Sequence, residues 1–150
     1  MFSISRFMSG FFKKIVTLGP IGNIKGSGTL ATFCSIPLIY FVSSSIFFTG
    51  LLIVFLFSAT AQTVSLFQKD DPAEIVSDEV IGFAVAMFGI KKSGIAYVVG
   101  FFLFRFFDIS KVCGIKRAES LPGSIGIVMD DVIAGLYTNF LLRLGLWLLL

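Results

Sequence analysis

Residues 28–67 read GTLATFCSIPLIYFVSSSIFFTGLLIVFLFSATAQTVSLF, and none of these side chains carries a charge. A single helix of this length would extend about 60 Å, whereas the hydrocarbon core of a bilayer is about 30 Å thick. We therefore expect two apolar helices joined by a turn near Thr49 and Gly50. An uncharged hairpin of this kind is typical of a membrane protein.

The composition of the whole chain points the same way. Of 150 residues, 56% are hydrophobic, 14% are charged and 19 are phenylalanine, and the mean hydropathy is +0.96. A soluble domain of this size has too little interior to bury so much apolar surface. The sequence predicts a single all-α, membrane-embedded domain over residues 1–150.

Charge and residue usage exclude several classes of function. The net charge is +3, and the lysines and arginines are scattered, so we expect no nucleic acid partner and favour anionic lipid headgroups. Histidine is absent, which excludes an imidazole base and a phosphohistidine intermediate. Cys34 and Cys113 fit neither a disulfide framework nor a zinc site, so we predict two free thiols.

Further apolar segments follow the hairpin at residues 80–90, 94–107 and 125–150. Together with the hairpin they give about five apolar helical segments in a membrane core over residues 28–150. The segments at 80–90 and 94–107 are short for membrane spans unless they extend into their polar flanks.

The N-terminal residues 1–22 are predicted to hold a helix that lies in the membrane interface. Over residues 6–18, apolar side chains share one helical face, and Arg6, Lys13 and Lys14 lie on the opposite face.

Antiparallel threading of the five segments returns alternate polar loops to the same membrane face. That face would receive most of the acidic side chains and most of the lysines and arginines of the chain. The positive-inside rule then makes this face cytoplasmic. The residues that we expect to meet there are Gly28, Thr29, Asp78, Glu79, Arg105, Asp108, Asp130 and Asp131.

Four carboxylates of this set suit a magnesium ion. Asp78 and Glu79 begin one segment, and Asp130 and Asp131 lie near the start of another. Magnesium prefers oxygen ligands, with one or two carboxylates completed by water and phosphate. Two alternatives are that Asp78 and Glu79 only complement a helix dipole, and that Asp130 and Asp131 belong to a solvated loop.

The cations near these carboxylates suit a phosphate group. Arg105 offers a guanidinium fork to phosphate oxygens, and Lys111 adds a compact positive charge. Asp108 is three residues after Arg105, so it would orient Arg105, or the two would form only a local salt bridge. Thr29 and Thr32, at the entrance of the first apolar helix, add a modest anion-binding arrangement.

Four motifs together resemble the bacterial phosphatidylglycerophosphatase A family. They are Gly28-Thr29-Leu-Ala-Thr32 followed by Ile36-Pro37, Asp78-Glu79-Val-Ile-Gly82, Phe104-Arg105-Phe-Phe-Asp108 with Lys111, and Gly126-Ile-Val-Met-Asp130-Asp131-Val-Ile-Ala134-Gly135. The resemblance implies an all-helical enzyme of the bacterial cytoplasmic (inner) membrane. It also implies magnesium-dependent hydrolysis of the terminal phosphate of phosphatidylglycerophosphate, which yields phosphatidylglycerol.

The resulting hypothesis is a multi-pass phosphoric monoester hydrolase with its active site on the cytoplasmic face. Asp78, Glu79, Asp130 and Asp131 would hold Mg²⁺, while Arg105 and Lys111 would hold the phosphate of a phospholipid substrate. Two rivals stay open: a phosphatase of another phospholipid such as phosphatidate, and a small transporter or ion-pathway component. A transporter would carry its charges near the bilayer midplane.

Overall fold

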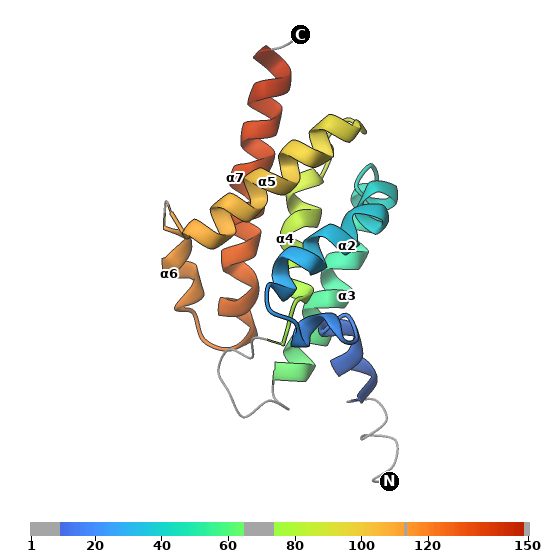
Figure 1. Ribbon diagram of the computed structural model, residues 1–150, viewed down its shortest axis with the longest axis vertical. Coiled ribbons are helices and arrows are strands. Elements are labelled where there is room, and N and C mark those ends of the chain that lie inside the picture. Colours follow the sequence, from blue (N-terminus) through green and yellow to red (C-terminus); the bar gives the residue numbers. More distant parts are fainter. Residues whose placement is uncertain (1–9, 65–73, 113, 149–150) are drawn as a thin grey trace.

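A computed structural model describes residues 10–64, 74–112 and 114–148 (Figure 1), and all regular structure in these ranges is helical, as predicted. The first nine residues of the predicted interfacial helix, and Cys113, lie outside the described residues. Residues 10–16 are helical and precede the 3₁₀ turn η1. The further elements are η1 (Ile21–Asn23), α2 (Ser27–Val42), α3 (Ile46–Val64), α4 (Ser77–Met87), α5 (Gly94–Ser110), α6 (Ile115–Glu119) and α7 (Ser124–Leu148).

The turn of the apolar hairpin lies earlier than we predicted. It falls between α2 and α3 at residues 43–45, which are all serines, and the prediction of a turn at Thr49 and Gly50 is wrong. Thr49 lies inside α3, and its hydroxyl donates a 2.9 Å hydrogen bond to the carbonyl of Val42 at the end of α2. Serine and threonine hydroxyls compete for backbone hydrogen bonds, which favours the turn at the three serines between α2 and α3. Gly50, in contrast, lies within α3.

Two of the described helices, α3 and α7, are long and apolar enough to cross a membrane. Helix α4 has 11 residues and extends only about 16 Å, about half of a hydrocarbon core. Helix α5 runs obliquely past α4 and α7 in Figure 1 and does not lie antiparallel beside them. The apolar segment predicted at residues 80–90 thus forms a short helix only as far as Met87, and this helix begins at Ser77.

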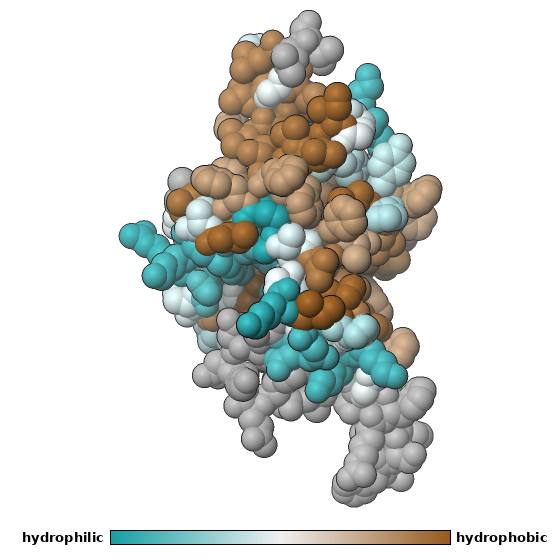
Figure 2. Space-filling view, viewed as in Figure 1, coloured by the Kyte–Doolittle hydropathy of each residue, from teal (hydrophilic) through white to brown (hydrophobic). Residues whose placement is uncertain are grey.

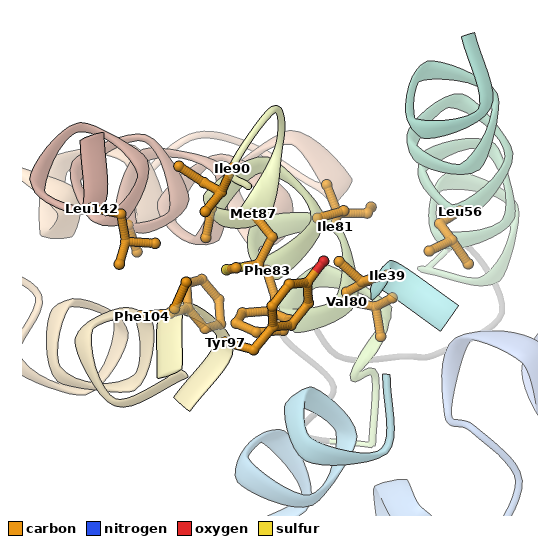
Figure 3. Close-up of a cluster of buried hydrophobic side chains, with 14 of the residues drawn as sticks. Ile39, Leu56, Val80, Ile81, Phe83, Met87, Ile90, Tyr97, Phe104 and Leu142 are labelled. Carbon is orange, nitrogen blue, oxygen red and sulfur yellow. The ribbon is translucent and has the colours of Figure 1, made fainter. Parts of the chain in front are cut away.

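Helix α4 is the centre of the fold. Its side chains Ile81, Phe83 and Met87 are fully buried, and the other four apolar helices surround it. Figure 3 shows these side chains meeting Tyr97 and Phe104 of α5, with residues of α2, α3 and α7 around them. The rings of Phe83 and Phe104 lie 5.9 Å apart. The polar start of this buried helix is consequently held in a fixed position.

Two glycines bring α4 and α7 into close contact. A Cβ atom on Gly82 would lie 2.6 Å from the carbonyl oxygen of Asp131, and one on Gly135 would lie 2.3 Å from the carbonyl oxygen of Gly82. Side chains cannot occupy such spaces, so the two helix backbones touch. This contact places the first turn of α4 beside the second turn of α7.

The far end of α4 is capped by side chains of α7. The amide nitrogen of Asn139 donates to the carbonyl oxygens of Ala86 and Phe88, each at 2.9 Å. Arg143 donates to Phe88 at 2.9 Å and to the side-chain oxygen of Asn139 at 2.7 Å. The last carbonyls of a helix have no partner within the helix, and in an apolar surrounding this would be costly. Asn139 and Arg143 therefore let α4 end inside the bundle.

We predict that Gly135→Ala destabilises the protein by about 1–3 kcal/mol, although alanine is the better helix former, because its Cβ would push α4 away from α7. Thermal unfolding of the purified protein in detergent measures the change. Gly50→Ala is the matched control: no atom lies within 4 Å of a Cβ built at Gly50, and we expect equal or higher stability. Equal effects of the two substitutions would contradict the close contact.

Candidate functional site

A polar cavity of about 500 Å³ lies where the start of α4, the end of α5 and the second turn of α7 meet. The loop between α6 and α7 forms its remaining wall. Figure 2 shows hydrophilic surface over α6 and the end of α5, below a more apolar upper part. The ionisable side chains that line it from α4, α5 and α7 are Asp78, Glu79, Asp108, Lys111, Asp130 and Asp131.

The carboxylates form two overlapping groups that share Asp131. One group is Asp78, Glu79 and Asp131, and the other is Asp108, Asp130 and Asp131. Within each group, one oxygen of each residue lies within 4.8 Å of the others. Asp130 and Asp131 are only 6% and 3% exposed, so the alternative of a solvated loop is wrong for them.

Three oxygens of this cluster are buried without a hydrogen-bond partner in the described part of the chain. They are Oδ1 of Asp78, Oε2 of Glu79 and Oδ1 of Asp131. A buried carboxylate oxygen without a partner is costly, and the cost rises when other carboxylates lie beside it. A cation bound between these helices would remove that cost. The donor set, which is all oxygen, fits a hard divalent ion such as Mg²⁺.

Asp108 contacts two cations: Lys111, which lines the cavity, and Arg105, which lies behind Asp108 and is not among the lining residues. Arg105 Nη1 lies 2.6 Å from one Asp108 oxygen, and Lys111 Nζ lies 3.2 Å from the other. The local salt bridge that the Arg105 and Asp108 spacing allowed is therefore present. Lys111 also donates to Asp130, so its ammonium group connects α5 with α7.

Lys111 has an unusual backbone that directs it into the cavity. It ends α5 in the left-handed region, with φ 48° and ψ 32°, where glycine or asparagine is usual. Burial lowers the pKa of Lys111, but the hydrogen bond to Asp130 and the nearby Asp108 carboxylate outweigh burial and raise the pKa above its usual value. The side chain is thus a fixed positive charge among the carboxylates.

The two threonines of the sequence prediction do not line the cavity. The Thr32 hydroxyl is buried and donates a 2.8 Å hydrogen bond to the carbonyl of Gly28, and Thr29 is exposed. Gly28 itself is close to the site, because a Cβ there would lie 2.0 Å from Glu79 Oε1 and 3.2 Å from Arg105 Nη1. The backbone at the start of α2 therefore packs directly against the side chains of Glu79 and Arg105.

Sequence reasoning missed the loop that closes the cavity. Glu119, Ser120, Leu121, Pro122 and Gly123 line it, and Glu119 adds a further, exposed carboxylate. A Cβ on Gly126 would lie 2.1 Å from the Leu121 carbonyl oxygen, so this loop rests directly on the first turn of α7. The Pro122-Gly123 pair was the available signal, since it marks a turn just before Asp130 and Asp131.

We predict that Lys111→Met, measured in EDTA, destabilises the protein by about 1–3 kcal/mol, because Asp108 and Asp130 lose the positive charge between them. Lys116→Met is the control: this lysine is exposed on α6, and we expect a change within about 0.5 kcal/mol. Denaturant unfolding in detergent gives both values. An equally stable Lys111→Met protein would mean that the bridge between α5 and α7 does not stabilise the fold.

Comparisons with known proteins agree with the resemblance seen in the sequence. The model of the phosphatidylglycerophosphatase A family matches residues 14–146. A Bacteroides thetaiotaomicron protein named "Putative phosphatidylinositol-3-phosphatase" is 34% identical over 83 residues, which are 53% of this chain and 52% of that protein. A Haemophilus influenzae protein named phosphatidylglycerophosphatase A is 38% identical over 69 residues, 45% of this chain and 42% of that protein.

The chain thus spans about half the length, or less, of these curated relatives. No solved structure matches the chain. The family match, however, covers most of the sequence and includes every carboxylate that lines the cavity. With the two apolar helices α3 and α7, it identifies a membrane protein, and the chain belongs to the phosphatidylglycerophosphatase A family.

Proposed function

We propose that the protein is a magnesium-dependent lipid phosphatase that removes the terminal phosphate of phosphatidylglycerophosphate. The products are phosphatidylglycerol and inorganic phosphate. The observation that carries this proposal is the meeting of Asp78, Glu79, Asp108, Asp130 and Asp131 around one cavity, with three of their buried oxygens lacking partners among the described residues. Carboxylates from three helices at one cavity are the arrangement that a metal-dependent phosphatase needs.

Asp131 is central to the proposed metal centre because it belongs to both carboxylate groups. Asp78 and Glu79 would hold Mg²⁺ from α4, and Asp130 and Asp131 would hold it from α7. The ion, when bound, would neutralise charge on the phosphate oxygens during hydrolysis.

The side chains of α5 would receive the phosphate. Lys111 brings an ammonium group into the cavity, and Arg105 lies beside it through their shared partner Asp108. In the proposed reaction a water oxygen adds to phosphorus, the ester bond between phosphorus and the glycerol oxygen breaks, and that oxygen takes up a proton. Asp108 would keep both cations in position while the charge on the phosphate changes.

We further propose that the cavity faces the cytoplasm at the bacterial inner membrane, with a multi-pass arrangement. Exposed lysines and arginines accompany the N-terminal helix, the turn before α2 and helix α6. Such an excess of positive charge favours the cytoplasmic side. The carboxylates lie at helix starts and ends and not at the middle of the long helices, which favours an enzyme over an ion pathway.

A second substrate deserves a direct comparison. The Bacteroides thetaiotaomicron relative is named a putative phosphatidylinositol-3-phosphatase, and its similarity extends over about half of this chain. Both lipids end in a phosphomonoester, so the same carboxylates and cations would suit either of them.

We expect phosphate release from phosphatidylglycerophosphate to require Mg²⁺, to stop in EDTA and to fall more than about 100-fold in Asp131→Asn, since even outer-shell partners of a metal are worth about 10–100-fold. Mg²⁺ should raise the unfolding temperature of the wild type and leave that of Asp131→Asn nearly unchanged.

The stability of Asp131→Asn without metal controls for a folding defect. In EDTA, Asp131→Asn should be as stable as the wild type or more stable, because it removes one negative charge from a buried group of like charges. Activity that persists in EDTA would refute the metal centre.

Among lipid phosphomonoesters, we expect phosphatidylglycerophosphate to give the highest kcat/KM when it is compared with phosphatidate and phosphatidylinositol 3-phosphate in the same detergent micelles. Malachite green detection of released phosphate measures all three rates. A higher kcat/KM for either competitor would move the substrate assignment to that lipid while leaving the phosphatase chemistry in place.

A further inference from the structure

An apolar groove of about 340 Å³ runs between α5 and α7, apart from the polar cavity. Exposed apolar side chains such as Ile95 and Val99 flank it on α5, so it opens towards the surroundings of the helices. Its lining includes Ala96, Val99, Leu103, Leu142, Gly145 and Leu146. No lysine, arginine, aspartate or glutamate lines it, which makes it suitable for a hydrocarbon ligand.

The groove and the cavity lie on the same two helices. On α7, Leu142 follows Asp131 by eleven residues, which is about 16 Å along the helix and only about 20° around it. On α5, Leu103 precedes Asp108 by five residues, or about 8 Å. Measured along the helix axes, the near end of the groove is therefore about 8–16 Å from the carboxylates; Leu142 and Asp131 share a face of α7, whereas Leu103 and Asp108 are about 140° apart around α5.

This separation matches the dimensions of a phospholipid with a phosphorylated headgroup. In phosphatidylglycerophosphate, about ten covalent bonds separate the terminal phosphorus from the oxygen of an acyl ester. At about 1.2 Å per bond in an extended chain, this is about 12 Å. A lipid whose terminal phosphate is in the cavity would begin its acyl chains near Leu103.

An aromatic pair lies between the two sites. The rings of Phe107 and Tyr137 are 5.6 Å apart, and each residue is one helical turn from the groove, next to Leu103 on α5 and Leu141 on α7. The pair joins α5 and α7 at the level where the glycerol backbone of such a lipid would lie.

Gly145 lines the groove, and no close contact among the described residues requires a glycine there. A glycine inside a helix costs about 0.5–1 kcal/mol relative to alanine. Gly82, Gly100, Gly126 and Gly135 are each required by a close contact, whereas no atom of the described residues lies within 4 Å of a Cβ built on Gly145. The space beside Gly145 is thus available to a molecule other than this chain.

We propose that the groove between α5 and α7 binds one acyl chain of the phospholipid whose terminal phosphate occupies the carboxylate cavity. This inference rests on the proposed function, because it assigns a further part of the same substrate to a second subsite. It makes the enzyme selective for lipids with long chains and identifies Gly145 as a residue that determines this selectivity.

The test compares long-chain and short-chain substrates. We expect the wild type to have a higher kcat/KM for the dioleoyl than for the dihexanoyl lipid, both presented at the same mole fraction in the same detergent micelles, because only the longer chain reaches along the groove and packs against its side chains. Gly145→Leu fills the groove and should lower the ratio of the two kcat/KM values by at least about tenfold. Gly145→Ala, which fills less of the groove, should lower the ratio less.

Gly50→Leu is the matched control. Gly50 also has no atom within 4 Å of a built Cβ, and it lines a different groove between α3, α4 and α7. We expect this variant to keep the wild-type ratio. An unchanged ratio in Gly145→Leu, or an equal fall in both leucine variants, would overturn the proposal and leave the groove to bulk lipid or a second copy of the chain.

A binding experiment separates this inference from the proposed function. Phosphatidylglycerol with a photoactivatable diazirine on one acyl chain should label residues 95–103 and 141–146 of the wild type in preference to the exposed face of α3. The labelling should fall in Gly145→Leu and persist in Gly50→Leu. If the wild type hydrolyses neither chain length, the proposed function fails, and labelling spread evenly over all apolar helices would overturn the groove as well.

Discussion

The arrangement of the site depends on the contact between Gly82 and Gly135, where α4 and α7 touch through their backbones. Helices with larger residues at a contact stay 8–10 Å apart, and the two halves of the carboxylate cluster would then separate. Gly82 follows Asp78 by one helical turn, and the carbonyl that Gly82 touches belongs to Asp131. The close contact therefore also aligns α4 and α7 along their axes so that Asp78, Glu79 and Asp131 lie together.

The polar ends of α4 are satisfied in different ways. At its start, carboxylates gather without enough hydrogen-bond donors among the described residues, which suits a site that receives a cation. At its end, Asn139 and Arg143 saturate the carbonyls of Ala86 and Phe88. A short helix that ends inside an apolar bundle needs such partners for its last carbonyls, because an unsatisfied backbone group is costly there. The end of α4 thus has its carbonyls satisfied, while its start carries the carboxylates of the proposed metal centre.

The sequence allowed the meeting of the carboxylates to be predicted, because charged residues in an apolar chain have few places to lie. Asp78, Glu79, Asp108, Asp130 and Asp131 do line one cavity. The hairpin turn was misplaced, because the effect of three consecutive serines depends on which backbone groups they can reach. The pairing of Lys111 with Asp130 was not predictable either, since it depends on a left-handed residue at the end of α5. The hydrogen bonds from Asn139 to the end of α4 were not predictable either, because a single polar residue in an apolar helix does not show in the periodicity of the sequence.

The contact between Gly82 and Gly135 also has an evolutionary consequence. A larger amino acid at either position meets backbone atoms and would push the two helices apart, whereas an amide can replace a carboxylate at Asp131 with little change in shape. The two glycines are thus more tightly constrained than the residues proposed for chemistry.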